Sequence, residues 1–360
     1  MSEVSILSNF GNMQNSHEKY MSRAIELANL GKYYTAPNPS VGAVIVHEEE
    51  IIGEGYHAQF GEAHAEVNAI NAVQNRELLK NSTLYVTLEP CAHFGKTPPC
   101  SNLIVENKIP KVVIATTDPF AKVNGKGIAF MKENGVEVIT QVLEAEGKEL
   151  NRRFFTFHQK KRPYVILKFA KSKDGFLARK AGEAHLGNWI TGALSKQLVH
   201  LWRAEEQAIL VGKNTALIDN PVLTCREVDG KNPIRMVIDL NLELPKELKL
   251  FDQSTKTVIF NEKRSETAEQ LHWVKKSLGK AMVQSVVDYC VQENILSLII
   301  EGGAGVLNQF IAANVWDEAR IFVGNQEFEE GIEAPILTGD LQYHGNLEQD
   351  QLFIYRNLGT

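Results

Sequence analysis

The chain has 360 residues, of which 44% are hydrophobic and 23% are charged. This length suggests two domains, and the composition is that of globular proteins with substantial apolar cores. The formal net charge of −6 at pH 7 argues against a nucleic-acid partner held by a broad basic surface. The sequence contains no apolar run of about 18 residues, so we expect no membrane span.

The first half of the chain alternates between expected helices and strands. Residues 1–15 lack the basic start and apolar run of a signal peptide, so we expect a flexible arm there. Ser16 caps a helix that runs from about residue 17 to 30 and stops at Gly31. The periodicity then predicts strands at 41–47, 50–56, 83–88, 111–116 and 136–139 and helices at 67–75, 101–107 and 127–133. This alternation predicts an α/β sandwich with helices over a central sheet.

Four residues in this half have the chemistry of a catalytic zinc site. His64, Cys91 and Cys100 offer one imidazole and two thiolates, and Glu66 offers a carboxylate. Three protein ligands leave a fourth position for water, and a nearby glutamate can move protons, as in zinc deaminases. A structural zinc more often uses a fourth protein ligand.

The cysteine spacing departs from the generic deaminase motif, which closes on a C-x-x-C pair. Here eight residues, Ala92 to Pro99, separate Cys91 from Cys100. The alternative interpretation is that the cysteines are buried small apolar side chains and that His64 is an ordinary core histidine.

The neighbouring elements favour metal binding. Residues two apart do not share a helix face, so a metal held by His64 with Glu66 close to it must lie over the start of the helix. Cys91 follows a strand, and Cys100 opens a second helix. Two helix N-termini directed at one site would stabilise thiolates. Zinc would acidify a bound water, and Glu66 would carry its proton to a departing amino nitrogen, which predicts hydrolytic deamination.

A cationic segment with a proline, residues 150–163, indicates either a domain boundary or a solvated helix end. A second alternating pattern begins at residue 164. It predicts strands at 164–168, 207–211, 234–238, 257–260, 296–300 and 318–323 and helices at 195–205, 265–278 and 304–313. We interpret this pattern as a complete second α/β domain.

Two further predictions concern the second half: one rests on a glycine-rich segment and the other on its cysteines. Residues 301–305, Glu-Gly-Gly-Ala-Gly, join a strand to a helix and would expose N–H groups as an anion cradle, although such glycines are also common turn formers. Cys225 and Cys290 are expected to be free thiols packed in the core. Four cysteines over this length are not a disulfide framework, which fits a reducing cytoplasm.

The stretch from Pro90 to Cys100, PCAHFGKTPPC, resembles one family closely, the bifunctional riboflavin-biosynthesis deaminase/reductase. The motif of this family has the same long cysteine spacing. Further matches in the same order span both halves: PNPSVG at 37–42, GYH at 55–57, HAE at 64–66, Lys168 to Gly175, WITG at 189–192, ILVG at 209–212, DNP at 219–221 and EGG at 301–303.

The resemblance implies a cytidine-deaminase-like α/β/α domain at 16–161 and a dihydrofolate-reductase-like α/β domain at 162–360. The first would use one Zn²⁺ per chain to release ammonia from 2,5-diamino-6-ribosylamino-4(3H)-pyrimidinone 5′-phosphate. The second would use NADPH to reduce the ribosyl group to ribityl. The partner is then a small phosphorylated pyrimidine, with no nucleic acid and no membrane, and we expect a cytoplasmic homo-oligomer.

The resemblance also assigns residues by position. It implies that His64, Cys91 and Cys100 bind zinc and that Glu66 is the proton shuttle. Residues that match deaminase substrate contacts are Asn38, His57, His93 and Lys96. In the second domain, cofactor positions are matched by Ala170, Trp189, Thr215, Asp219, Gly303, Ala304 and Gly305, and substrate positions by Arg203, Leu223, Arg226 and Glu301. The two arginines are suited to hold a phosphate.

Three positions depart from the family pattern. Trp202 stands where leucine is common, and Lys196 stands where arginine is common. Gly187 stands where some members have a serine that contacts substrate, a contact that glycine cannot make through a side chain.

Two other functions are compatible with the residues alone. One is a zinc deaminase for another small nucleoside or nucleotide, with a non-catalytic second domain, and activity on cytidine would distinguish it. The other is a non-enzymatic protein stapled by zinc. Glu66 argues against this second function, because a structural site has no use for a proton shuttle.

Overall fold

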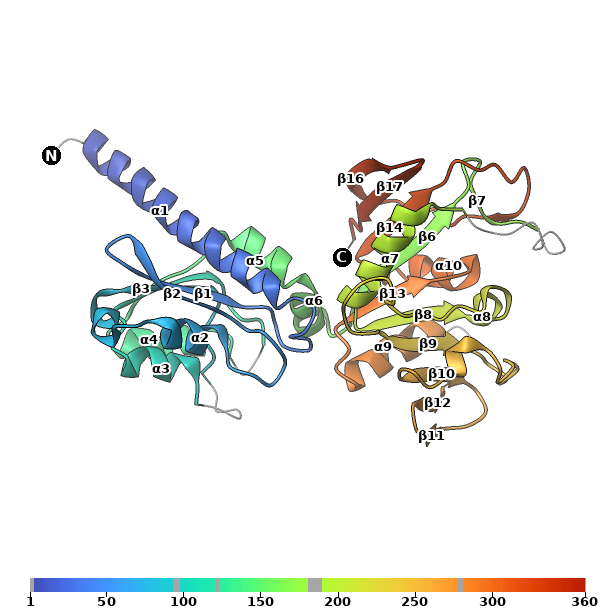
Figure 1. The fold of residues 1–360 in the computed structure, drawn as a ribbon, viewed down its shortest axis with the longest axis horizontal. Coiled ribbons are helices and arrows are strands. Elements are labelled where there is room, and N and C mark those ends of the chain that lie inside the picture. Colours follow the sequence, from blue (N-terminus) through green and yellow to red (C-terminus); the bar gives the residue numbers. More distant parts are fainter. Residues whose placement is uncertain (1–2, 93–97, 121–122, 181–189, 277–280, 360) are drawn as a thin grey trace. The chain divides into compact units, whose positions relative to one another are not determined.

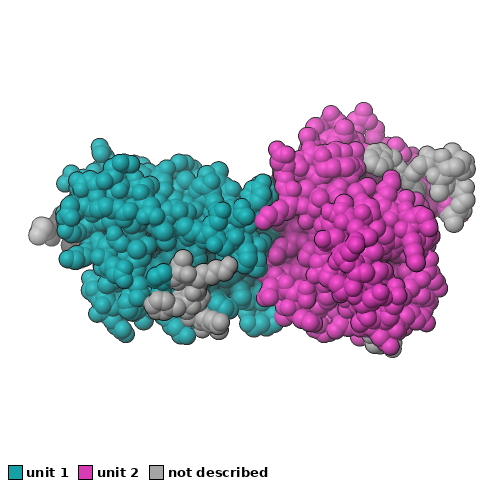
Figure 2. All heavy atoms as spheres, turned by 60° about the horizontal axis from the view of Figure 1, so that its bottom comes forward, with its two compact units in different colours: residues 1–161 teal, residues 162–360 magenta. Residues whose placement is uncertain are grey.

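The computed structural model describes residues 3–92, 98–120, 123–180, 190–276 and 281–359. The chain forms two compact units, residues 1–161 and 162–360 (Figures 1 and 2). The described part of the chain contains no helix that is both long and apolar enough to cross a membrane. The contacts predicted for His93, Lys96 and Trp189, and the departure at Gly187, fall outside the described residues.

Among the described residues, the first unit is built on a five-stranded sheet in the order β2-β1-β3-β4-β5 (Figure 1). Its strands are β1 (Gly42–His47), β2 (Glu50–Tyr56), β3 (Thr83–Leu88), β4 (Lys111–Thr116) and β5 (Glu137–Ile139). β1 is antiparallel to β2 and β3, whereas β3, β4 and β5 run parallel. The carboxyl ends of β3 and β4 therefore meet at one edge, which is where α/β sheets bind ligands.

Helices cover both faces of this sheet, because successive side chains of a strand point to opposite faces and both sets are apolar. Ala43 and Ile45 belong to the core formed with α2 (Ala65–Ala72), α3 (Cys100–Glu106) and α4 (Lys126–Glu133). Val44 and Val46 belong to the core formed with α1 (Glu3–Leu30). A 3-10 turn (Arg76–Asn81), α5 (Glu144–Leu150) and α6 (Arg152–Lys160) complete the unit. The predicted α/β/α sandwich is confirmed.

Helix α1 begins at Glu3, whereas the sequence predicted an arm over residues 1–15 and a helix from residue 17. The prediction took Ser16 as an N-cap. A serine acts as an N-cap only where the residues before it do not continue the helix. Residues 3–15 contain no proline to interrupt the helix, so it extends through them to Glu3. Tyr20, Met21, Ala24 and Leu27 form the buried stripe that docks the C-terminal half of α1 on the sheet.

In its described part, the second unit is built on a ten-stranded sheet in the order β11-β12-β10-β9-β8-β13-β6-β14-β17-β16. The strands from β12 to β14 in this order run parallel: β12 (Leu271–Lys275), β10 (Thr257–Asn261), β9 (Ile234–Ile238), β8 (Ala208–Gly212), β13 (Ser297–Glu301), β6 (Tyr164–Lys171) and β14 (Glu318–Val323). Antiparallel strands close both edges: β11 (Glu266–Ala268), β17 (Asp350–Arg356) and β16 (Asp340–Leu347). β7 (Phe176–Ala178) and β15 (Ile332–Glu333) form a separate pair.

Helices also cover both faces of the larger sheet. α7 (Ala193–Glu205) and α8 (Lys213–Asp219) contribute Val199, Trp202 and Ala216 to one core. α9 (Met282–Gln292) and α10 (Ala304–Ala312) contribute residues such as Val286 and Phe310 to the other core. A short 3-10 turn (Lys249–Phe251) lies between β9 and β10. The prediction of a second α/β domain is confirmed.

The predicted helix at 265–278 is wrong, because residues 266–275 form the hairpin of β11 and β12. Glu269 has a left-handed φ of 52°, which makes a tight turn between the two strands. β12 then pairs along its whole length with β10, and its Leu271 and Trp273 pack against the core. Pairing with an existing sheet thus outweighs the weak helical propensity of this segment. Sequence analysis also missed α9 and the β16–β17 hairpin.

Glu89 ties the end of β3 to the start of α4. Its carboxylate is 3% exposed and accepts hydrogen bonds from the backbone N–H groups of Asp118 (3.2 Å), Gly125 (2.9 Å), Gly127 (3.0 Å) and Ile128 (3.2 Å). A carboxylate at a helix N-terminus also complements the helix dipole. A Cβ atom on Gly127 would lie 2.1 Å from the carbonyl oxygen of Pro90, so glycine permits this close approach.

Replacement of Glu89 by alanine should destabilise the first unit. The change leaves buried N–H groups without an acceptor, which we expect to lower the free energy of unfolding by about 3 kcal/mol. The control is Glu137→Ala, since the side chain of Glu137 is 59% exposed and pairs with Lys111 at 3.1 Å. That change should cost less than about 1 kcal/mol. Urea unfolding followed by circular dichroism gives both values, and equal losses would contradict this role of Glu89.

Candidate functional site

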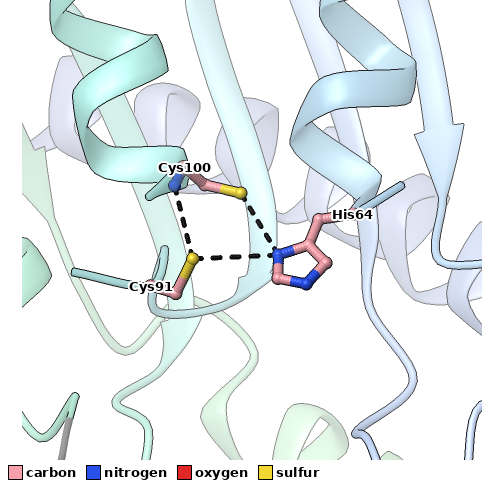
Figure 3. Close-up of side chains that lie close together, drawn as sticks. All are labelled: His64, Cys91 and Cys100. Atoms are coloured by element: carbon pink, nitrogen blue, oxygen red, sulfur yellow. Dashed lines mark hydrogen bonds between the residues drawn. The ribbon is translucent and has the colours of Figure 1, made fainter. Parts of the chain in front are cut away.

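Three elements of the first unit bring His64, Cys91 and Cys100 together (Figure 3). His64 is the N-cap of α2, Cys100 is the first residue of α3, and Cys91 follows β3. Nδ1 of His64 lies 3.8 Å from Sγ of Cys91 and 3.3 Å from Sγ of Cys100. The three potential ligand atoms all lie within 4.8 Å of one another.

These distances fit a zinc ion. Zn–S bonds of about 2.3 Å and Zn–N bonds of about 2.0 Å at tetrahedral angles place N and S about 3.5 Å apart. The two N···S distances of 3.8 Å and 3.3 Å bracket this value. One imidazole and two thiols are also the donor set expected of a catalytic zinc with an open fourth position.

The backbone around Cys91 fixes its side chain. The backbone N–H of Cys100 points at Sγ of Cys91, with N and Sγ 3.3 Å apart. Both the N–H and the hydroxyl of Ser101 donate to the carbonyl oxygen of Cys91, at 3.2 Å and 3.0 Å. Hydrogen bonding from the Cys100 thiol is the largest influence that lowers the pKa of Cys91, which falls to about 4. The same hydrogen bond raises the pKa of Cys100, so Cys91 is the thiol of the pair that loses its proton first and gives the thiolate form that binds metals.

Glu66 lies two residues after the histidine and is 3% exposed. Its burial, and next the thiolate charge of Cys91, raise the pKa of the Glu66 carboxyl above its ordinary value. A carboxyl with a raised pKa takes up and releases protons more readily near neutral pH than an exposed glutamate does. The predicted proton shuttle is therefore buried in the first turn of α2, beside the ligand cluster.

Asn38 and His57, predicted to contact the deaminase substrate, lie next to this cluster. The rings of His57 and His64 meet edge to face with centroids 5.5 Å apart. Nδ1 of His57 lies 3.0 Å from the carbonyl oxygen of Ala63, and its Nε2 lies 3.2 Å from the amide nitrogen of Asn38. Burial lowers the pKa of His57, so the ring is neutral at pH 7. Nδ1–H then donates to Ala63, and Nε2 accepts from Asn38.

Asp118, which was not predicted from the sequence, follows β4 as Glu89 follows β3. Its side chain is buried, and burial raises the pKa of its carboxyl to about 6. The charges of Glu89 and Cys91 act in the same direction, and this places Asp118 in the electrostatic environment of the cluster. A polar residue directly after a buried parallel strand was the signal that could have identified it.

In the second unit, Glu301 ends β13 in a group of buried charges. Nε and Nη2 of Arg203 donate to its two carboxylate oxygens at 3.0 Å and 2.7 Å, and Nζ of Lys168 lies 3.8 Å away. Burial alone would raise the pKa of Glu301, but the charges of Arg203 and then Lys168 lower it to about 2. Arg203 and Glu301, predicted separately as substrate contacts, are thus bound to each other.

The glycine turn after β13 contacts α8. Gly302 has a φ of 153°, and a Cβ atom there would lie 3.0 Å from Oγ1 of Thr215. The N–H of Gly303 donates to the same oxygen at 2.8 Å. Ala304 and Gly305 are the first residues of α10, where N–H groups have no acceptor within the helix. Four of the predicted cofactor residues therefore meet in the structure: Thr215, Gly303, Ala304 and Gly305.

The other described residues predicted to contact cofactor or substrate in the second unit lie on separate elements. Asp219 is the last residue of α8 and is exposed, and Arg226 is exposed in the following loop. Leu223 in the same loop is 2% exposed and has a left-handed φ of 56°. Ala170 lies on β6 and pairs with Phe322 on β14. The structure does not bring these residues into direct contact with the glycine turn.

Both halves of the chain match known protein families. Residues 14–116 match the zinc-binding region of cytidine and deoxycytidylate deaminases, and residues 163–342 match the RibD C-terminal domain. The chain is 40% identical over 320 residues to the riboflavin biosynthesis protein RibD of Aquifex aeolicus, covering 88% of each chain. It is also 40% identical over 331 residues to RibD of Bacillus amyloliquefaciens, covering 89% of this chain and 85% of that protein.

Solved structures give the same result. A diaminohydroxyphosphoribosylaminopyrimidine deaminase/5-amino-6-(5-phosphoribosylamino)uracil reductase from Thermotoga maritima has a TM-score of 0.85 at 36% identity, covering 96% of this chain and 99% of that one. A RibD structure from Acinetobacter baumannii has a TM-score of 0.87 at 32% identity, with coverage of 96% and 99%. The predicted family is confirmed: the chain belongs to the RibD family of riboflavin biosynthesis, as a bifunctional enzyme with a zinc-dependent deaminase and an NADPH-dependent reductase.

Proposed function

We propose that residues 16–161 carry out the deamination and residues 162–360 the reduction. In the first unit the proposed zinc ligands are His64, Cys91 and Cys100, and the proposed proton shuttle is Glu66. The single observation that carries this assignment is the cluster of three ligand atoms within 4.8 Å beside a buried carboxyl. When bound, zinc supplies the acidity that turns water into a nucleophile at neutral pH.

The residues of the first unit then have separate roles in deamination. Glu66 accepts the proton of the attacking water and delivers it to the amino nitrogen that leaves as ammonia. Neutral His57 offers its Nε2 edge, and Asn38 its amide, to polar atoms of the pyrimidine. Asn38 and His57 already hydrogen-bond each other, so a substrate can exchange one contact for another at little cost. The substrate proposed here is the phosphorylated diaminopyrimidine of the family.

For the reduction we propose that the pyrophosphate of NADPH lies on the N-terminus of α10, over Gly303, Ala304 and Gly305. The N–H groups there and the helix dipole suit an anion. NADPH supplies the hydride that reduces the ribosyl group. The other cofactor positions carried over from the family are Ala170, Trp189, Thr215 and Asp219.

The substrate of the reductase would meet Glu301, Leu223 and Arg226. Arg203 and Lys168 keep Glu301 ionised, so that its oxygens can accept hydrogen bonds from ribosyl hydroxyls. Because the guanidinium of Arg203 donates to Glu301 and to the carbonyl oxygen of Thr224, we now assign the phosphate to exposed Arg226. This revises the expectation that both arginines hold the phosphate.

Two substitutions separate zinc binding from proton transfer. Cys91→Ser should lose the zinc, because a serine hydroxyl is not a thiolate donor. Glu66→Gln should retain the zinc and lower the deamination rate by about 10²–10⁴-fold, since glutamine has the shape but not the basicity of glutamate. Metal analysis and ammonia release are the two measurements. Full zinc content in Cys91→Ser, or a nearly unchanged rate in Glu66→Gln, would overturn these assignments.

Substitution of the glycine turn tests the cofactor site. Gly303→Val adds a side chain over the turn and should raise the KM for NADPH about tenfold or more, while deamination in the same protein stays intact. The variant Thr215→Val removes the hydroxyl that accepts from the N–H of Gly303 but adds no side chain over the turn, so the KM for NADPH should rise less. An unchanged KM in Gly303→Val would place the cofactor elsewhere in this unit.

We also propose that the protein is a cytoplasmic homo-oligomer. Its four cysteines are free, which suits a reducing compartment. The edge strand β16 exposes Leu341 and Tyr343, and an uncovered edge strand can pair with a second copy. Light scattering after gel filtration should give a multiple of the 40.2 kDa chain mass, and a single-chain mass would contradict the proposal.

A further inference from the structure

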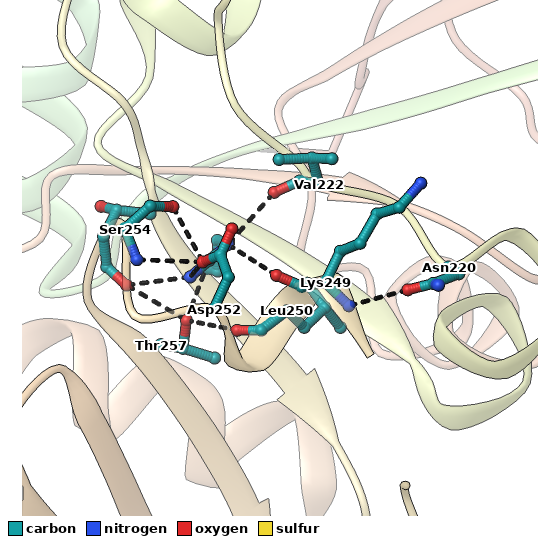
Figure 4. A network of polar contacts seen from close by, with 9 residues as sticks. Asn220, Val222, Lys249, Leu250, Asp252, Ser254 and Thr257 are labelled. Atoms are coloured by element: carbon teal, nitrogen blue, oxygen red, sulfur yellow. Dashed lines mark hydrogen bonds and ion pairs between the residues drawn. The ribbon is translucent and has the colours of Figure 1, made fainter. Parts of the chain in front are cut away.

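Arg235 is a fully buried arginine on β9, with 0% of its surface exposed. Its guanidinium donates to acceptors from several segments: Oγ1 of Thr257 (2.8 Å), Oδ1 of Asp252 (2.8 Å) and the carbonyl oxygens of Thr255 (3.1 Å), Lys249 (3.2 Å) and Val222 (3.4 Å) (Figure 4). A buried guanidinium needs partners for its donors, because an unpaired buried charge is strongly destabilising. The position of Arg235 therefore constrains every segment that supplies an acceptor.

The contact with Val222 reaches a functional loop. Residues 219–226 connect α8 to the rest of the unit and include the three residues proposed to bind ligands, Asp219, Leu223 and Arg226. Asn220 adds a second tie, since its Oδ1 accepts from the backbone N–H of Lys249 at 2.8 Å. The turn at residues 249–252 is itself held by Arg235, so the contacts of Val222 and of Asn220 both depend on this one side chain.

The loop needs such support because its conformation is strained. Leu223 has a φ of 56°, a left-handed conformation that is unfavourable for a residue with a Cβ atom. Strain of this kind persists only where the surroundings enforce it. The far end of the loop is held separately: Arg203 donates to the carbonyl oxygen of Thr224 at 3.3 Å, and the N–H of Cys225 donates to Asn232 at 3.0 Å. Arg235 and Asn220 supply the restraint at the near end.

We propose that Arg235 is a positioning residue for the reductase, which acts through Val222 and the turn at 249–252 to hold the loop of residues 219–226 in its binding conformation. This inference rests on the proposed assignment of Leu223 and Arg226 to the reductase substrate. Arg235 itself contacts neither substrate nor cofactor. Its loss should therefore weaken binding of the substrate more than it slows the chemical step.

The test compares three variants of the full-length, zinc-loaded protein, with the deaminated pyrimidine nucleotide as substrate. Arg235→Met removes all the hydrogen bonds but keeps the length of the side chain. Asn220→Gly removes only the tie to Lys249 and tolerates the left-handed φ of 38° at this position. Thr257→Val is the control: it removes the bond to Nε of Arg235 and the bonds from the Thr257 hydroxyl to the carbonyl oxygens of Leu250 and Thr255, but it leaves the contacts of Arg235 with Val222 and Lys249 in place. Each variant is measured for kcat, the KM for substrate, melting temperature and deamination.

We expect Arg235→Met and Asn220→Gly to raise the KM for the nucleotide about tenfold with a smaller change in kcat. Thr257→Val should lower the melting temperature and leave this KM unchanged. If Arg235→Met does not fold, shown by loss of its second unit, Asn220→Gly carries the test alone. A KM that is unchanged in Asn220→Gly, or raised as much in Thr257→Val, overturns the inference. Absence of reduction in the unmodified protein would instead refute the proposed function.

Discussion

The geometry of one metal site constrains the first half of this protein. A zinc ion can be bound only where its ligand atoms lie within a few ångströms of one another, and the three proposed ligand atoms lie within 4.8 Å. The atoms of the proposed ligands come from the start of α2, the end of β3 and the start of α3. The parallel pairing of β3 with β4 sets that edge of the sheet, and the hydrogen bonds of Glu89 and Ser101 hold the backbone on both sides of Cys91. The fold thus brings the proposed ligands from three separate elements to one place.

In the second half of the chain, paired charges rather than a metal ion hold the residues of the proposed site in place. Its proposed site lies where parallel strands end, and there a buried carboxylate, Glu301, stays ionised because Arg203 and Lys168 lie beside it. Loss of either Arg203 or Glu301 would leave the other charge uncompensated in a largely buried place, so each side chain holds the other in position. Arg235 has the same effect further along the sheet on a strained loop. In both units, the proposed contacts to ligands lie at or after the carboxyl ends of parallel strands, where α/β sheets bind ligands.

The sequence predicted features that depend on residue type and short spacing. An imidazole, two thiols and a carboxylate indicated a zinc site, and most strands of both sheets matched their apolar runs. Contacts between residues distant in the chain were not predictable. The pairing of Arg203 with Glu301 spans 98 positions, and it changes the role expected of the arginine. The hairpin of β11 and β12 was predicted to be a helix. Its conformation depends on the pairing of β12 with β10, and the residues of the hairpin alone do not indicate this pairing. Arg235 was missed because its role depends on burial among partners distant in the chain, whereas the position of Asp118 directly after a buried strand could have identified it.

The most direct test of two separate sites is to remove and restore zinc while both reactions are followed. Protein stripped of zinc by a chelator is given either the diaminopyrimidine nucleotide or its deaminated product, together with NADPH. The stripped protein should release no ammonia from the first compound but should oxidise NADPH with the second at the rate of the intact enzyme. Added zinc should then restore deamination. Ammonia release without zinc, or loss of NADPH oxidation with the deaminated product, would contradict two separate sites.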